Sequence, residues 1–352
     1  MTRILSGIRP SGKLHLGNYL GAIKNWIELQ DRQDIDLAVF MIADYHGITT
    51  PFDPKKYSEQ ILETACEFLA AGLDYKKVLL IRQSQIPQHT ELAWIFSSIT
   101  PETFFRRLPT FTEKIKEVIE KKVGVLPEDF DINKTKYLQG YFQDIPDISL
   151  GLLAYPALMA ADILIYKANL VPVGQDQLPH IYLTNEIVKR FNSKFGETFG
   201  VVKEYIAEGA KIMSLQNPKQ KMSKSADEGI ALNDSPSEIK EKIKKAVTDS
   251  GKEIIYEPQK KPAISNLITL YKIFSRKSLE EIKNQYEGKT YIQFKDDLAE
   301  IIIEFLKPFQ KRYSEFKSDS EEVKKILEIS EGIARNEAKK TLHEIKQKIG
   351  LL

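Results

Sequence analysis

The sequence predicts an α/β fold in which a doubly wound parallel sheet is followed by an all-helical part. Strand-like and helix-like segments alternate through residues 1–100, as a parallel sheet covered by helices requires. The segments 4–8, 36–43 and 78–81 are short and almost continuously apolar, which is typical of strands buried on both faces. From residue 235 onward, apolar residues recur at intervals of three and four, the period of an amphipathic helix.

Helices are expected between these strands. The segment 54–71 is predicted to be a helix that stops at Gly72, since glycine suits the left-handed residue after a helix. Another helix is predicted to begin near Gly17, after the first strand and a turn that contains proline and glycine. Ligands of such sheets bind at the carboxyl ends of strands, near the point where the strand order reverses. The loops 10–18 and 44–47 both follow strands, so we place them at that edge.

Residues 150–215 return to alternating helix and strand patterns. An apolar helix is predicted over 150–168 and a strand over 170–173. A second helix is predicted to run to about Asn192, and 212–215 is predicted to be the last strand of the sheet.

Residues 104–148 interrupt this alternation and are rich in lysine and glutamate. We interpret them as an insertion with one amphipathic stretch, 113–122. The sequence leaves three interpretations of this insertion open: a solvated surface segment, a lid over the active site, or part of a dimer surface.

The helical part predicts a second domain. Its predicted helices cover residues 236–247, 264–274, 294–316 and 321–349. Ser318 and Glu321 predict a capping box at the start of the last helix. We divide the chain into a Rossmann-like catalytic domain, 1–216, and a helical domain, 217–320, and expect the C-terminal helix, 321–352, to pack back on the catalytic domain.

Composition narrows the class of protein. A chain of 352 residues is long enough for two domains, and its formal charge of +2 permits nucleic-acid binding without demanding it. Cys66 is the only cysteine, which excludes a disulfide framework within the chain and a cysteine-based zinc or iron–sulfur site. The sequence shows neither a signal-peptide pattern nor an apolar run of membrane-spanning length. We therefore expect a cytoplasmic protein with neither a membrane nor DNA as partner.

The segment 221–225 has the sequence Lys-Met-Ser-Lys-Ser and is the most informative stretch of the chain. It places two flexible ammonium groups and two hydroxyls on one short loop, where they can hold a polyphosphate that changes shape during a reaction. Taken alone, a cluster of lysines and serines is also compatible with an ordinary solvated loop.

A second motif lies in the loop 10–18, which has the sequence Pro-Ser-Gly-Lys-Leu-His-Leu-Gly-Asn. It joins the first strand to a helix, and backbone N–H groups at such a helix start attract phosphate. His15 and Asn18 add side chains that form hydrogen bonds. A single histidine in a loop is more often structural than catalytic. This motif therefore indicates a functional site only in combination with the lysine motif.

Together the two motifs resemble the paired signatures of class I aminoacyl-tRNA synthetases. His15 to Asn18 is similar to the family's His-Ile-Gly-His element, with Leu16 in place of isoleucine and Asn18 in place of the second histidine. The segment 221–225 matches the family's second element at every position, and the two elements occur in the family's order.

One predicted helix carries a candidate substrate pocket. Tyr155, Met159 and Asp162 are spaced to share one helix face. A carboxylate on an otherwise apolar face is costly unless it has a partner. It is either a core aspartate bonded to nearby backbone or an acceptor for a ligand donor. An indole N–H and a phenol O–H can both donate to a carboxylate, so these residues alone leave tryptophan and tyrosine open.

Longer segments resemble the tryptophanyl-tRNA synthetase family. The segment 155–164 reads Tyr-Pro-Ala-Leu-Met-Ala-Ala-Asp-Ile-Leu, and 171–177 reads Val-Pro-Val-Gly-Gln-Asp-Gln. Further similar segments are 183–185, 190–192, 246–250 and 286–289. The resemblance extends through nearly the whole chain, with 104–148 as its weakest part.

The resemblance implies three groups of site residues, carried over by position. The residues implied to bind tryptophan are Asp162, which would accept the indole N–H, with Tyr155, Met159, His46, Val171, Val173, Gln177, Leu5 and Gly7. The residues implied to contact ATP are Arg9, Pro10, Ser11, Gly17, Asn18, Gly174, Gln175, Asp176, Ile212, Lys221, Met222, Ser223, Lys224 and Ser225. The implied catalytic residues are His15, Asn18, Lys221 and Lys224.

The activity implied is ligation of L-tryptophan to tRNA(Trp) in two steps through a tryptophanyl-adenylate. ATP and Mg²⁺ would take part, the ion bridging phosphates without a protein carboxylate cage. The resemblance also implies a homodimer and a helical domain that reads the anticodon. The rival interpretations are a tyrosyl-tRNA synthetase, a small-molecule nucleotidyltransferase, and a non-catalytic paralogue that binds RNA.

The sequence departs from the family pattern at three places. Leu5 stands where many relatives have phenylalanine against the indole, and Arg9 stands in place of a frequent glutamine. Thr112 replaces a phosphate-binding lysine that many relatives have, for which Lys114 or Lys116 are the nearest substitutes. These departures put the fine geometry of the pocket in question.

Overall fold

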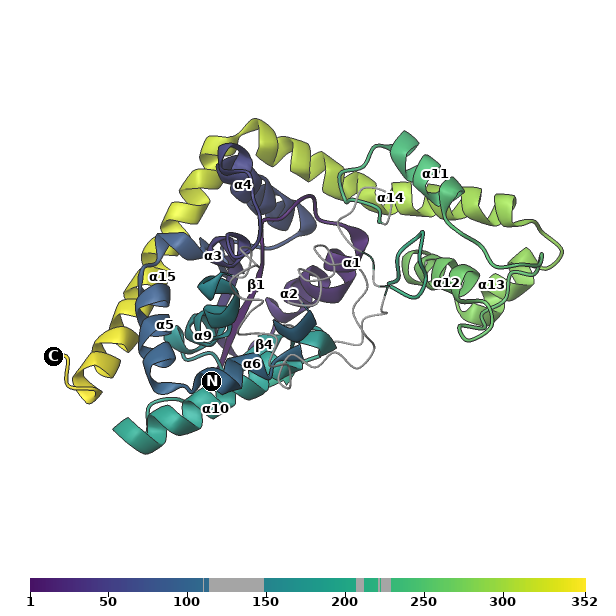
Figure 1. Ribbon diagram of the computed structural model, residues 1–352. Coiled ribbons are helices and arrows are strands. Elements are labelled where there is room, and N and C mark those ends of the chain that lie inside the picture. The colour runs from purple at the N-terminus through teal and green to yellow at the C-terminus, as the bar shows by residue number, and fades with distance from the viewer. Residues whose placement is uncertain (110, 114–148, 207–211, 221, 223–228) are drawn as a thin grey trace.

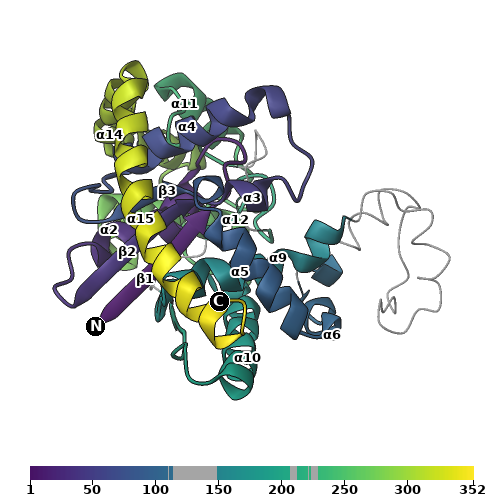
Figure 2. The same cartoon turned by 90° about the vertical axis from the view of Figure 1, so that its left-hand side faces the viewer.

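The computed structural model describes most of the chain (Figures 1 and 2). The described residues are 1–109, 111–113, 149–206, 212–220, 222 and 229–352. Most of the predicted insertion 104–148 and most of the lysine motif 221–225 therefore lie outside the described residues.

A five-stranded sheet forms the centre of the first half of the chain. Its strands are β1 (Thr2–Ile8), β2 (Ile35–Ile42), β3 (Leu79–Arg82), β4 (Leu170–Pro172) and β5 (Lys203–Tyr205). They lie in the order β3-β2-β1-β4-β5, and every neighbouring pair is parallel. The chain builds outward from β1 in one direction and then in the other, so the order reverses between β1 and β4. The predicted doubly wound parallel sheet is confirmed.

Helices cover both faces of this sheet. They are α1 (Leu16–Asn18), η1 (Tyr19–Ile23), α2 (Lys24–Leu29), α3 (Asp44–Gly47), α4 (Pro54–Ala71), η2 (Gln83–Gln85), α5 (Gln88–Ile99), α6 (Glu102–Arg106), α9 (Leu150–Ile165), η3 (Gln175–Gln177) and α10 (Leu178–Phe195). The helix predicted near Gly17 is present as the continuous run from α1 to α2. The helix predicted over 54–71 is α4, and Gly72 ends it with a φ of +115°, in the left-handed region.

Adjacent residues of β2 point to opposite faces and enter separate hydrophobic cores. On one face Phe40 stacks on Trp26 of α2 with ring centroids 4.8 Å apart, and Phe68 of α4 meets the same indole edge-on at 5.2 Å. On the other face Val39 joins the core that contains Phe96 of α5. This two-sided burial explains why the strand is almost continuously apolar.

The predicted last strand at 212–215 is wrong. The fifth strand is β5 (Lys203–Tyr205), which pairs with β4. Met222 donates its N–H to the carbonyl of Ile212 at 3.1 Å, and the N–H of Ser214 donates to that of Gln220 at 2.8 Å, so the described residues 212–220 and 222 pair with one another outside the sheet. β5 escaped the sequence pattern because its first two residues are exposed and charged.

Helices dominate the rest of the chain: α11 (Pro236–Lys245), α12 (Pro262–Ser275), α13 (Leu279–Tyr286), α14 (Tyr291–Ser318) and α15 (Ser320–Lys348). The four predicted helices are present, and α13 is additional. The predicted capping box of Ser318 and Glu321 is wrong. Asp319 caps α15 by accepting the N–H of Glu322 at 3.1 Å, whereas the Ser318 hydroxyl donates to the carbonyl of Glu315 within α14.

Two long helices connect the parts of the molecule. Figure 1 shows α11, α12 and α13 gathered around one end of α14, whose body packs against α11 and α4. α15 then turns back along the sheet and packs against β3, α5 and α4 (Figure 2). Among the described residues, no helix is both long and apolar enough to cross a membrane.

Candidate active site

A cavity of about 1080 Å³ lies at the carboxyl ends of β1 and β4, where the strand order reverses. Nearly all the described residues of the predicted site line it: Leu5, Gly7, Arg9, Ser11, His15, Gly17, Asn18, His46, Tyr155, Met159, Asp162, Val171, Val173, Gly174, Gln175, Asp176, Gln177, Ile212 and Met222. Pro10 is buried beside the cavity without lining it. Lys221, Ser223, Lys224 and Ser225 lie outside the described residues.

His15 caps the helix that begins at one wall of this cavity. Its Nδ1 accepts the backbone N–H groups of Gly17 at 3.1 Å and Asn18 at 3.3 Å, and the Asn18 amide oxygen accepts the N–H of His15 in return. Because Nδ1 is an acceptor, a neutral His15 ring carries its proton on Nε2. A Cβ on Gly17 would lie 2.9 Å from that ring, so only glycine leaves room for this cap.

The His15 loop pairs with chain from beyond the lysine motif. His15 and Ala231 form an antiparallel bridge, in which Leu16 donates to the carbonyl of Ile230 at 2.9 Å. Met222 is buried, and its Cβ would be 3.5 Å from a Cβ built on Gly17. The described residues on both sides of 223–228 therefore lie beside the helix start that His15 caps.

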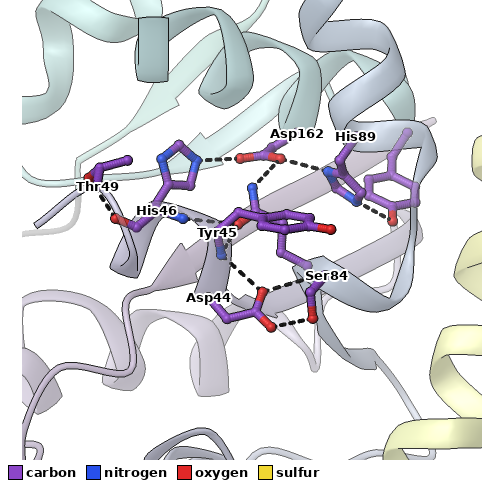
Figure 3. Close-up of polar contacts among 9 residues, drawn as sticks. Asp44, Tyr45, His46, Thr49, Ser84, His89 and Asp162 are labelled. Carbon is purple, nitrogen blue, oxygen red and sulfur yellow. Dashed lines mark hydrogen bonds and ion pairs between the residues drawn. The ribbon is translucent and has the colours of Figure 1, made fainter. Parts of the chain in front are cut away.

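Asp162 is buried in the floor of the cavity, with 1% of its surface exposed. Its Oδ1 accepts from Gln83 Nε2 at 2.7 Å and from His89 Nδ1 at 2.6 Å, and its Oδ2 accepts from His46 Nε2 at 2.8 Å (Figure 3). Burial opposes ionisation, but the hydrogen bonds from the two histidines outweigh it and hold the pKa of Asp162 below its ordinary value.

The two oxygens of this carboxylate face different surroundings. The partners of Oδ1, Gln83 and His89, do not line the cavity, whereas the partner of Oδ2, His46, does. Oδ2 is therefore the oxygen nearer the cavity, and with a single partner among these three side chains it has a lone pair for a further donor.

His89 extends the network away from the cavity. Because its Nδ1 donates to the carboxylate, its Nε2 accepts from the hydroxyl of Tyr166 at 2.9 Å. Burial raises the pKa of Tyr166 well above its ordinary value, so this hydroxyl remains protonated and can donate. The Tyr166 hydroxyl thus donates to His89, and His89 donates to Asp162. These two hydrogen bonds fix the orientation of the Asp162 carboxylate.

Gln83 connects the carboxylate to the backbone beneath His46. Its amide oxygen accepts the N–H groups of Tyr45 at 3.1 Å and His46 at 3.4 Å, while its amide nitrogen donates to Asp162. Gln83 is completely buried, so water does not compete for these hydrogen bonds. The side chain of Gln83 thus sets the spacing between α3, which carries His46, and α9, which carries Asp162.

Tyr155 lies beside His46, with ring centroids 6.2 Å apart. Its hydroxyl lies 2.8 Å from Nε2 of His180. Burial, followed by the nearby charge of His46, lowers the pKa of His180 to about 4. His180 is therefore neutral near pH 7, and it orients the Tyr155 hydroxyl without adding positive charge to the cavity.

Gln83, His89 and His180 were not predicted from the sequence. A signal existed for Gln83, because it follows the predicted strand 78–81 and so belongs to the ligand-binding edge of the sheet. His89 lies on α5, which the sequence pattern did not single out. Among the described residues, no cluster of three histidine, cysteine or acidic side chains could hold a metal ion.

The walls and the floor of the cavity differ in chemistry. Leu5, Met159 and Val171 are among the apolar lining residues, and they surround an ionised acceptor at Asp162. The capped helix start at Asn18 lies on another part of the lining. The arrangement suits a ligand with a flat apolar part that carries one donor, next to an anionic group that the helix dipole favours.

Comparisons with known proteins identify the family of the chain. The family model described as class I tRNA synthetases (W and Y) matches residues 1–307. The chain is 42% identical to the tryptophan–tRNA ligase of Caldanaerobacter subterraneus subsp. tengcongensis, over 100% of this chain and 99% of the relative. It is 40% identical to the tryptophan–tRNA ligase of Wolinella succinogenes, over 99% of each.

Solved structures show the same likeness. The tryptophanyl-tRNA synthetase of Mycoplasma pneumoniae matches with a TM-score of 0.82 and 30% identity, over 99% of this chain and 98% of that one. The tryptophanyl-tRNA synthetase of Campylobacter jejuni, in complex with ADP and tryptophan, matches with a TM-score of 0.80 and 30% identity, over 99% and 100%.

Proposed function

The chain belongs to the class I tRNA synthetases of the tryptophan and tyrosine type, and we propose that it ligates L-tryptophan to tRNA(Trp) with ATP. The observation in the structure that carries the proposal is the ionised, nearly fully buried Asp162 on the floor of an apolar cavity, which suits an aromatic amino acid with one donor. A phenol could also donate to this carboxylate. The support for tryptophan over tyrosine comes from the tryptophan–tRNA ligases that match the full length of the chain.

We assign the amino-acid half of the site to the groups around Asp162. The indole N–H donates to Asp162 Oδ2, beside His46, and the indole ring lies against Leu5 and Met159. Because the carboxylate is already ionised and oriented, the site need not reorganise when the indole enters. The further residues assigned to this half are Gly7, Tyr155, Val171, Val173 and Gln177.

The phosphate half of the site is assigned to the His15 loop and the turn after β4. Nε2 of His15 and the amide of Asn18 donate to oxygens of the α-phosphate, at a helix start that favours negative charge. The further residues assigned to ATP are Arg9, Pro10, Ser11, Gly17, Gly174, Gln175, Asp176, Ile212 and Met222.

Activation needs no nucleophile from the protein. The carboxylate of tryptophan attacks the α-phosphorus of ATP, and pyrophosphate leaves, so catalysis rests on positioning and on stabilising the charge of the leaving group. We assign that stabilisation to Lys221 and Lys224, with Ser223 and Ser225 as further phosphate ligands. ATP would enter as its magnesium complex, in which the ion would neutralise charge on the phosphates.

Transfer follows when a terminal ribose hydroxyl of the tRNA attacks the activated carbonyl. We propose that residues 217–320 form the domain that contacts the anticodon, and that 1–216 with the helix 321–352 form the catalytic domain. Packing of α15 against β3 and α5 supports this division. We further propose a homodimer that works in the cytoplasm, as the family resemblance implies.

ATP–pyrophosphate exchange tests the function directly. Purified protein is incubated with MgATP, labelled pyrophosphate and either tryptophan or tyrosine. Exchange that requires tryptophan supports the proposal, and exchange that requires tyrosine replaces it with the tyrosyl enzyme. Absence of exchange with every amino acid would favour a non-catalytic RNA-binding paralogue or a nucleotidyltransferase for another substrate.

A further inference from the structure

A carboxylate of the C-terminal helix is bound to the end of the edge strand of the sheet. β3 has a neighbour on one side only, and α15 covers its open edge. Glu331 of α15 has 2% of its surface exposed. Its Oε1 accepts the backbone N–H of Arg82 at 3.1 Å and Nε at 2.7 Å, and its Oε2 accepts Nη2 at 2.9 Å. One side chain thus pairs both the backbone and the guanidinium of the last residue of β3.

The same helix binds the other end of the turn that follows. Arg335 lies one turn beyond Glu331, and its Nη2 donates to the carbonyl oxygen of Gln85 at 2.8 Å. α15 therefore holds the four residues 82–85, which we call the edge turn, at its first and its last residue. At one end α15 accepts hydrogen bonds from Arg82, and at the other end it donates one to Gln85. A displacement of the edge turn along α15 would therefore break both contacts.

The residues inside the edge turn point toward the active site. Gln83 donates to Asp162 and accepts from the backbone N–H of Tyr45. Ser84 donates its backbone N–H to Asp44 at 2.8 Å, and its hydroxyl also bonds that carboxylate (Figure 3). α3, which carries His46, is thus attached to the edge turn by two separate side chains.

We propose that Glu331 is a positioning residue of the amino-acid site, which sets selectivity for the indole N–H through Arg82 and Gln83. The inference rests on the proposed function. Glu331 lies outside the cavity lining, yet two residues link it to the carboxylate that receives the indole donor. The C-terminal helix is therefore a functional part of the amino-acid site as well as a cover for the sheet.

The physical argument concerns what Arg82 does without its partner. A guanidinium that is three-quarters buried and loses its carboxylate is costly to keep in place, so it moves toward water. The backbone N–H of Arg82 shares the oxygen Oε1 with Nε of the guanidinium, so the edge turn shifts when the guanidinium moves. A small shift of Gln83 then lengthens its 2.7 Å bond to Asp162 and leaves the carboxylate free to rotate.

The test is Glu331→Gln, measured by ATP–pyrophosphate exchange with tryptophan and with β-(benzothiophen-3-yl)alanine, in which sulfur replaces the indole N–H. An amide keeps the size of the side chain but turns one acceptor into a donor that faces Arg82. We expect the KM for tryptophan to rise about tenfold, with the KM for ATP changed less than about twofold. The KM for the sulfur analogue should change little, so the preference for tryptophan should fall.

A carboxylate on the same helix supplies the matched control. Glu337 binds Arg3 at 3.0 Å, near the start of β1, and makes no contact with the edge turn. Glu337→Gln should lower the melting temperature without changing the preference for tryptophan over the analogue. If Glu331→Gln lowers stability and leaves that preference as in the control, Glu331 is only a structural anchor and the inference is refuted.

A milder variant protects the test from loss of folding. Arg335→Met removes the contact with Gln85 at a partly exposed position, and it should shift the same preference in the same direction by about twofold to threefold. An unchanged preference here refutes the inference.

Titration of the active sites by adenylate formation corrects every rate for the folded fraction. A wild-type protein that does not use tryptophan refutes the proposed function itself, whereas normal wild-type exchange with unchanged variants refutes the inference alone.

Discussion

Replacing the carboxylate of Asp162 by an amide should abolish most recognition of the indole N–H. In Asp162→Asn one oxygen becomes an NH₂ group. The remaining oxygen is expected to face Gln83 and His89, because together they present two donors at 2.7 and 2.6 Å. The NH₂ group then faces His46 and the cavity. His46 can adapt by taking its other tautomer and accepting from the amide, whereas the indole N–H has no such freedom.

The size of this effect follows from placing the new NH₂ group, a buried donor, opposite the indole N–H, which is also a donor. An unsatisfied buried donor costs up to about 3 kcal/mol, so kcat/KM for tryptophan should fall by about 10²-fold. The KM for ATP should not change, since the altered group contacts no proposed ATP residue. The amide also forms weaker hydrogen bonds with His46 and His89 than the ionised carboxylate does, so the variant should melt at a lower temperature than the wild type.

The assay is ATP–pyrophosphate exchange at several tryptophan concentrations, with the sulfur analogue as the internal control. The analogue has no N–H, so Asp162→Asn should reduce its kcat/KM far less than that of tryptophan. Equal losses for both amino acids would show that Asp162 shapes the pocket without receiving the indole proton. A loss of less than about fivefold for tryptophan would refute the reasoning about the opposed donors.

Three further outcomes are expected. Lys224→Ala should slow adenylate formation in single-turnover measurements far more than it weakens tryptophan binding, and equal losses would contradict a role on the leaving group. Gly17→Ala places a Cβ 2.9 Å from the His15 ring and should slow the same step about tenfold with an unchanged KM for tryptophan; an unaltered rate would show that the cap tolerates the shift. Because the pKa of His180 is lowered to about 4 from its ordinary 6.5, the unfolded chain binds a proton first as the pH falls. The free energy of unfolding should therefore lose up to about 3 kcal/mol between pH 6.5 and pH 4, and His180→Gln should flatten this part of a urea-denaturation profile.

Local patterns predicted the parts of the fold whose causes are local. The strand β2 is almost continuously apolar because both of its faces are covered, and α4 ends at Gly72 because the next turn needs a left-handed residue. β5 (Lys203–Tyr205) left no such pattern, since its place in the sheet comes from pairing with β4 rather than from burial. α13 was missed for a similar reason, as Ile282 and Tyr286 are its only buried residues and two positions do not define a period.

The candidate site shows the same division. The residues placed in the cavity by resemblance all come from short contiguous motifs, and the described ones line it except Pro10. The groups that hold Asp162 come from elsewhere: Gln83 and His89 are 79 and 73 residues away in the sequence. No spacing rule connects residues so far apart. The pairing of His89 with Asp162 depends on how α5 packs against α9, which only the folded chain reveals.

The two halves of the site are held in different ways, and this has a consequence for variants. The amino-acid half is attached to the sheet by buried side-chain bonds that involve Gln83, Asp162 and, through Arg82, Glu331 of α15. The phosphate half depends on a loop that caps its own helix at His15 and pairs with chain beyond the lysine motif. Changes in the first half should therefore appear mainly in the KM for tryptophan. Changes in the second should appear mainly in the rate of adenylate formation, because phosphate contacts strengthen as charge develops on the leaving group.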